Sequence, residues 1–143
     1  MPIHIETVGL ISTTMRLDGW DRLTTVLRVA PELGLQALGR SLYATANKIF
    51  NESQMQVPVR RGILRSTGFV APPALQGNGQ LAVRISYGGA SAPYAYDQHY
   101  NLAYRHAPGR KALYLSDPVY AATPNLERWI QADVGRTLSG LGL

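Results

Sequence analysis

Apolar residues recur at steps of three and four in the second quarter of the chain. They are Leu35, Leu38, Leu42, Ala46 and Ile49. This spacing is typical of an amphipathic helix with one buried face. Pro31 suits a first helical position, and Pro58 disfavours helical backbone at the residue before it. The pattern therefore predicts one long helix from Pro31 to near Val57.

Other stretches alternate apolar and polar residues or are short apolar runs between turn residues, as strands do. We expect strands at 3–7, 63–71, 81–87, 94–99 and 112–115. The alternation is cleanest from Leu81 to Tyr87, whereas residues 10–17 are ambiguous. Pro72 and Pro73 close the second of these strands, and residues 76–79 predict a loop or hairpin tip.

Two more helices are expected. Asp18 can cap a short one whose apolar face carries Trp20, Leu23 and Leu27. The other lies at the C-terminal end, where apolar residues again recur at helical spacing. Both Asp117-Pro118 and Thr123-Pro124 are suitable helix starts, and the pattern does not choose between them.

This order of elements indicates an α+β fold. We expect an antiparallel sheet of about four strands, with the long helix and the C-terminal helix packed on one face. The 143 residues suit a single domain, 1–143, with a core spanning about 15–139. The absence of cysteine excludes disulfides and thiolate chemistry, and fits a protein made in a reducing cytoplasm. No membrane span or signal peptide is expected.

Three segments carry a resemblance to a known family. The first is V-P-V-R-R-G-I-L-R-S-T from Val57 to Thr67, the second is P-Y-A-Y-D-Q-H from Pro93 to His99, and the third is K-A-L-Y-L from Lys111 to Leu115. Together they resemble the tail-completion, or neck, proteins of tailed bacteriophages. In that family a helix ends in a V-P-V-x-x-G-x-L-R-x-S turn. A P-Y-A-x-x-x-H strand and a K-A-x-x-L strand follow before the closing helix.

The resemblance implies a structural virion protein, made in the host bacterial cytoplasm, and no enzyme. Such a protein forms a homo-oligomeric ring, six-fold or twelve-fold, at the phage neck. It would bind the head connector or stopper on one side and the tail terminator or tail tube on the other. Double-stranded DNA would pass through the channel without sequence recognition. The resemblance implies no cofactor and no membrane.

Tyrosine and arginine are enriched at protein interfaces. We therefore expect subunit or partner contacts at two places, the basic turn and the tyrosine-rich segment. Their candidate residues are Arg60, Arg61, Arg65, Tyr94, Tyr96, His99, Tyr104, Arg105, His106 and Lys111. The stretch from Tyr100 to Lys111 is either an extended arm that reaches a partner or an ordinary surface loop.

Two alternatives stay open. The formal charge of +5 favours acidic partners, and tyrosines among cations could form a single-stranded nucleic-acid platform. Asp97 and His99 would share one face of a strand and could form an acid–base or metal pair. No metalloprotease motif, nucleophile elbow or phosphate-binding loop accompanies that pair. We therefore expect no catalytic residues and no metal site.

Overall fold

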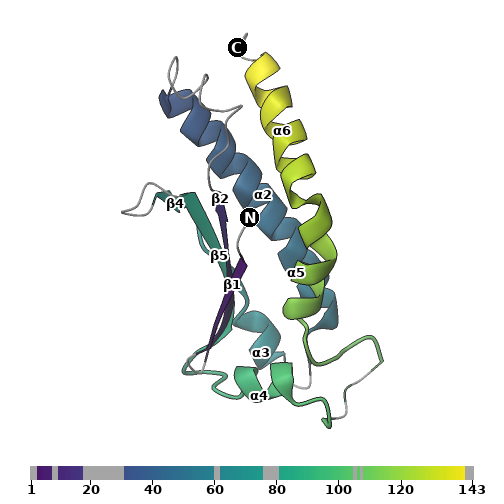
Figure 1. Ribbon diagram of the computed structural model, residues 1–143. Coiled ribbons are helices and arrows are strands. Elements are labelled where there is room, and N and C mark those ends of the chain that lie inside the picture. Colours follow the sequence, from purple (N-terminus) through teal and green to yellow (C-terminus); the bar gives the residue numbers. More distant parts are fainter. Residues whose placement is uncertain are drawn as a thin grey trace.

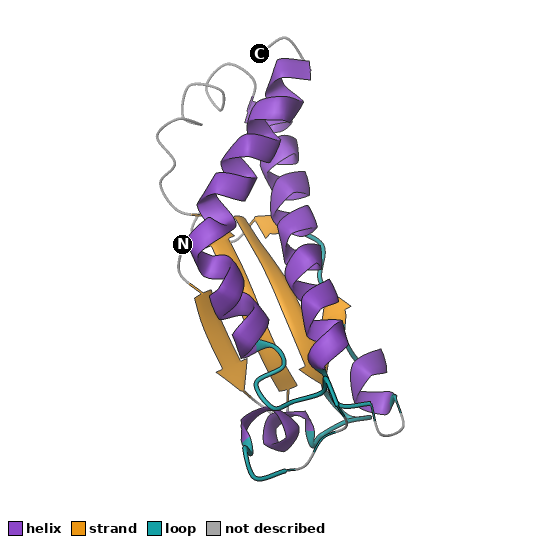
Figure 2. Ribbon diagram, turned by 90° about the vertical axis from the view of Figure 1, so that its right-hand side faces the viewer, coloured by secondary structure: helices purple, strands orange, loops and turns teal. Residues whose placement is uncertain are grey.

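The computed structural model describes residues 3–7, 10–17, 31–59, 62–75, 81–104, 106 and 108–140. They form a sheet with helices on one of its faces (Figure 1). Seen from the side of those helices, the two longest run across the sheet, which lies behind them (Figure 2). The chain therefore has the predicted α+β architecture, with its long helices in front of one face of an antiparallel sheet.

The sheet is built around strand β5 (Leu81–Gly88), the strand with the cleanest alternation. Strand β2 (Leu10–Leu17) pairs along one side of β5, and β1 (Ile3–Thr7) pairs with β2. On the other side of β5 lie two short strands, β3 (Phe69–Val70) and β4 (Ala74–Leu75). All four pairings are antiparallel, in the order β1-β2-β5-β3, with β4 also on β5.

The register explains why this sheet is four strands wide. Phe69 pairs with Ser86, and Ala74 pairs with Ala82, so β3 and β4 lie end to end along the same edge of β5. Between them stand Pro72 and Pro73, which cannot donate to a ladder and suit an edge position. The predicted number of strands is confirmed, but residues 10–17, which fitted no single pattern, supply one of the central strands.

The predicted long helix is confirmed as α2 (Pro31–Gln56). It contacts β5 and β3 on one side and α6 (Leu126–Gly140) on another. Its predicted stripe is buried at Leu38, Leu42, Ala46 and Ile49, whereas Leu35 is partly exposed. Small buried residues, including Ala37 and Ser41, widen this buried face. The breadth of the face fits a helix that packs against a sheet and a second helix together.

Both expected starts of the C-terminal helix are used. Asp117 and Pro118 lie in the first turn of α5 (Ser116–Ala122), and Thr123 and Pro124 form most of the short 3-10 turn η1 (Thr123–Asn125). Helix α6 follows without a break. Proline in a first turn costs no hydrogen bond, which allows the helical path to continue through both prolines.

Three predicted strands are wrong in whole or in part. Residues 63–66 form a short helix, α3 (Ile63–Ser66), so only Phe69 and Val70 of the segment 63–71 are in a strand. Residues 94–99 mostly belong to helix α4 (Ala95–Tyr100). Residues 112–115 form bends and turns, and Leu113 has a φ of 56°, in the left-handed region that extended strands avoid.

The burial of α4 explains the second error. Ala95 and His99 are fully buried and stand four residues apart, which is the spacing of one helical face. A strand would place Ala95, Asp97 and His99 on one face, so the exposed Asp97 between two buried residues fits the helix and not the strand. The predicted short helix after Asp18 and the predicted loop at 76–79 lie outside the described residues.

Candidate interaction surface at the α3–α4 end

The segments that carry the family resemblance meet at one end of the molecule, around the lower end of the sheet in Figure 1. The first begins where α2 ends, and its Val57 and Leu64 are buried in the core. The third is tied to the end of α2 just before the first, because the Lys111 backbone nitrogen donates to the Gln56 carbonyl oxygen at 2.9 Å. The second is tied to the third, because the Leu113 nitrogen donates to the His99 carbonyl oxygen at 2.6 Å.

Two glycines shape the first segment. Gly62 precedes α3 with a φ of 72°, a conformation that costs other residues free energy. Gly68 follows α3 and has no room for a side chain. A Cβ there would lie 2.6 Å from Gln54 Nε2, 2.7 Å from Phe50 and 2.8 Å from Tyr87. The chain therefore turns at Gly62 before α3 and passes tightly against α2 and β5 at Gly68 after it.

Arg110 closes the C-terminal end of α2. Its Nη1 donates to the Gln54 carbonyl oxygen at 2.8 Å and approaches the Val57 carbonyl oxygen at 3.4 Å. Carbonyl groups at the end of a helix lack partners within the helix and carry partial negative charge. The guanidinium group of Arg110 supplies both a hydrogen-bond donor and a positive charge at this helix end. The C-terminal end of the stretch from Tyr100 to Lys111 is thus fixed to α2. The prediction of an arm now applies only to residues 101–104, which are exposed.

His99 is a core residue, and this corrects its place in the expected interface. Its side chain has 0% exposure, so it offers no surface to a partner. Its Nε2 lies 3.1 Å from the Ser116 backbone nitrogen and 3.2 Å from Ser116 Oγ. Because a backbone N–H can only donate, Nε2 must accept, and the ring proton of neutral His99 sits on Nδ1. Burial lowers the pKa of His99 to about 4, and nearby Asp117 opposes this shift.

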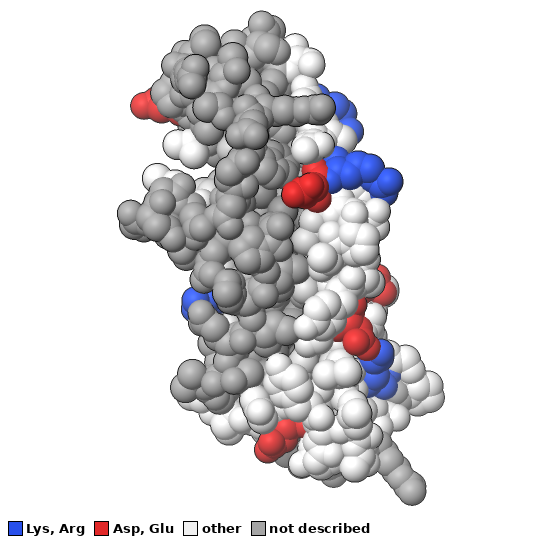
Figure 3. Space-filling view, in the orientation of Figure 1, with Lys and Arg blue, Asp and Glu red and all other residues white. Residues whose placement is uncertain are grey.

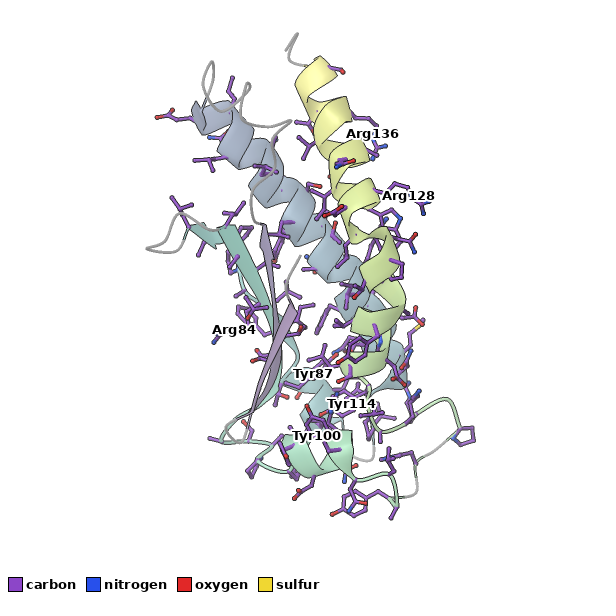
Figure 4. The ribbon with its side chains drawn as sticks, viewed as in Figure 1. Arg84, Tyr87, Tyr100, Tyr114, Arg128 and Arg136 are labelled. Atoms are coloured by element: carbon purple, nitrogen blue, oxygen red, sulfur yellow. The ribbon has the colours of Figure 1, made fainter. Side chains whose placement is uncertain are left out.

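A continuous series of aromatic rings runs from the core to the surface at this end. The rings are, in order, Phe50, Tyr87, Tyr114, His99, Tyr100 and Tyr96. Neighbouring ring centroids are 4.4–5.8 Å apart, within the range of favourable aromatic contacts. Burial raises the pKa of Tyr87 and of Tyr114, and the Tyr114 hydroxyl donates to the Ala95 carbonyl oxygen at 2.9 Å. Figure 4 shows Tyr87, Tyr114 and Tyr100 in this order toward α4.

The outer end of this series is an exposed aromatic surface. Tyr96 and Tyr100 have ring centroids 4.9 Å apart on α4. The pKa of Tyr100 is raised by partial burial and then by Tyr96 and Tyr120, so the exposed Tyr120 on α5 lies near enough to influence Tyr100 electrostatically. We call Tyr96, Tyr100 and Tyr120 the tyrosine cluster. All three are exposed, as are the nearby chain positions Tyr94, Leu102 and Tyr104.

The described cations of the tyrosine-rich segment already bind partners within the chain. Lys111 forms an ion pair with Asp117, and Arg110 binds the end of α2. Arg65 on α3 differs, because it is exposed and forms no ion pair with a described residue. On the face in Figure 3, described cations and carboxylates lie near one another along the α6 side and do not gather into one basic surface.

The structure places the remaining predicted site residues as follows. Tyr94, Tyr96 and Tyr104 are exposed, as expected for contact residues. His106 is half-buried, and its Nε2 has no hydrogen-bond partner among the described residues. Arg60, Arg61 and Arg105 lie outside the described residues.

Sequence reasoning missed Tyr120 and the role of Arg110. Tyr120 stands on the exposed side of α5, outside the apolar residues that indicated the C-terminal helix. Nothing in the sequence pointed from Arg110 to a helix end more than fifty residues earlier.

The acid–base alternative loses its geometric basis. Asp97 and His99 lie on a helix, where residues two apart point to different faces, and Asp97 is exposed while His99 is buried. Within the described part of the chain, no group of three or more His, Asp or Glu side chains could hold a metal ion. Nor is any helix among the described residues both long and apolar enough to cross a membrane.

Comparisons of the chain with protein-family models, with curated proteins and with solved structures find no match.

Proposed function

We propose that this chain is a structural protein of a tailed-phage virion and forms an oligomeric ring at the neck. The ring joins the head connector to the tail and leaves a channel for DNA. In this role the chain works by binding other copies and neighbouring virion proteins. It performs no chemistry, and this part of the proposal rests on the family resemblance.

The observation that carries the proposal is the convergence of the three resembling segments. They lie up to fifty residues apart in sequence, yet backbone hydrogen bonds hold them at one end of the fold. Leu113 bonds His99, and Lys111 bonds Gln56, the residue just before the first segment. Their shared residue types have structural roles there: Val57, Leu64 and Ala95 are buried, and Gly62 has positive φ. A resemblance by chance alone would not be expected to select residues that build a single junction.

The nucleic-acid alternative is less well supported. A single-stranded platform needs cations beside exposed rings to hold phosphates. Here Lys111 is neutralised by Asp117, and Arg110 is held by carbonyl oxygens. The exposed carboxylate of Asp97 stands on the same short helix as Tyr96 and Tyr100, and it would repel a phosphate backbone. The exposed rings are therefore better suited to a protein partner.

The proposal is tested by the mass and shape of the assembled protein. Sedimentation of the full chain at micromolar concentrations is expected to give a particle that is a whole multiple of 15.6 kDa. Negative-stain images of that particle should show closed rings with a central channel. A species that stays monomeric at every concentration, and binds short oligonucleotides with strong salt dependence, would instead support the nucleic-acid alternative.

A further inference from the structure

We infer that neighbouring copies of this chain meet side by side, with α3 of one copy against the tyrosine cluster on α4 and α5 of the next. Arg65 of the first copy supplies the cation that the cluster receives. This inference rests on the proposed ring and adds the two surfaces that would close it.

The first support is the composition of the two surfaces. The tyrosine cluster presents phenol rings beside one acidic side chain, Asp97, and the described cations of its segment, Arg110 and Lys111, are engaged elsewhere. Aromatic ring faces attract cations, most strongly where water is excluded. The cluster thus fits a partner that brings an unpaired cation in an apolar setting.

The second support is that the chain itself exposes such a surface. Arg65 on α3 is exposed and without an ion pair among the described residues. It is accompanied by Ile63 at 41% exposure and by Phe69 on β3 at 57% exposure. This end of the chain thus exposes one cation and two large apolar side chains, which complement a surface of phenol rings with a carboxylate. Lys48, which lies 4.7 Å from the ring centre of Trp129, forms this kind of cation–ring contact within the chain.

The third support is where the two surfaces lie on the sheet. Helix α4 contacts β2 and β5, whereas α3 contacts β5 and leads directly into β3. Because β2 and β3 stand on opposite sides of β5, the two surfaces flank the same end of the sheet on opposite sides. A contact between two different patches on opposite flanks repeats from copy to copy, which is the arrangement that closes a ring.

The absence of native cysteine permits a direct test. A variant with both Arg65→Cys and Tyr96→Cys is expected to form a ladder of disulfide-linked species, dimer, trimer and higher, under mild oxidation. Neither single variant should form more than traces of dimer, since each patch meets the other patch and not itself. The pair Arg136→Cys with Tyr96→Cys is the matched control, because Arg136 lies at the other end of the molecule from Tyr100 (Figure 4), and it should form no ladder.

Association without cysteines gives a second measurement. Arg65→Ala and Tyr100→Ala should each raise the concentration for half-assembly about tenfold, as the loss of a desolvated cation–ring contact does, and Arg136→Ala should not. A ring that forms while the Arg65–Tyr96 cysteine pair gives no ladder would overturn this inference and leave the proposed function standing. Strong dimer formation by the single Tyr96→Cys variant would also overturn it, because the cluster would then meet itself. Failure of the wild-type chain to form any ring would reject the proposed function instead.

Discussion

His99 accepts a hydrogen bond at Nε2 from the backbone nitrogen of Ser116, 3.1 Å away, and so joins α4 to the start of α5. The ring is packed edge-on against Tyr100 and Tyr114, with centroid distances of 4.4 and 5.0 Å. Protonated His99 would lose this acceptor and place a charge among aromatic rings. The junction is therefore built for the neutral imidazole.

A pH dependence of stability follows. Unfolded His99 takes up a proton near pH 6.5, whereas burial holds the folded pKa at about 4. Between these values the unfolded chain binds more protons, so stability should fall as the pH drops from about 6.5 to about 4. The full loss is about 3 kcal/mol, since one pKa unit corresponds to about 1.4 kcal/mol.

Urea unfolding of the wild type and of His99→Gln at several pH values in this window measures the effect. The variant should be less stable at pH 7 and have a flatter profile, because Gln does not titrate. Carboxylates affect both proteins alike, so the difference between the two curves reports His99. Parallel curves would show that His99 is not the group responsible.

The long helix gives the simplest test of the core. Leu42 is fully buried on α2, and Leu42→Ala should lower the free energy of unfolding by about 2–5 kcal/mol. Leu33 stands on the same helix at 42% exposure, and Leu33→Ala should cost less than about 1 kcal/mol. Denaturant melts of both variants check the assignment of the buried face, which would be wrong if the two losses were similar.

The long helix, the strand β5 and the fold class could be predicted because their periodic patterns agree with their final burial. The short elements could not, because tertiary contacts decide them. Ala95 and His99 are buried by partners at Ser116 and Tyr114, which no local pattern reveals. For the surface, residue type pointed to Tyr96 and Arg65, but only the fold shows that Tyr120 joins the cluster and that His99 does not.

Gly68 should tolerate no side chain. A Cβ at this position would lie within 2.6–2.8 Å of Gln54, Phe50 and Tyr87, and two of these neighbours are packed aromatic rings. Gly68→Ala should therefore cost about 1–3 kcal/mol of unfolding free energy, as overpacking does. Gly135→Ala on α6 is the control. A Cβ there meets nothing within 4 Å, so the helix should gain up to about 1 kcal/mol. Thermal melts that move both variants in the same direction would contradict the packing.

At Leu113, substitution by glycine should give a more stable protein than substitution by alanine, which is the reverse of their usual order. Its φ of 56° lies in the left-handed region, which costs a residue with a Cβ about 1–2 kcal/mol. Leu113→Gly should thus be about 1 kcal/mol more stable than Leu113→Ala. At Ala132, which is exposed in the middle of α6, glycine should instead lower stability by about 1 kcal/mol. Equilibrium unfolding of the three variants and the wild type measures these differences in stability. If alanine were more stabilising than glycine at both positions, a strained turn at Leu113 would be excluded.

Arg110 should stabilise the junction through the end of α2. Its guanidinium group donates to the Gln54 and Val57 carbonyl oxygens and is partly buried. A hydrogen bond from a charged donor is worth about 1.5–3 kcal/mol, so Arg110→Ala should lower stability by about that amount. Arg128→Ala should change it by no more than about 0.5 kcal/mol, since Arg128 is exposed and its bond among the described residues is to the side chain of Asn125. Amide hydrogen exchange locates the effect. Loss of Arg110 should speed exchange at Lys111, whose N–H binds the Gln56 carbonyl oxygen, more than in the centre of β5. Equal acceleration throughout the chain would mean that Arg110 supports the whole core and not this junction.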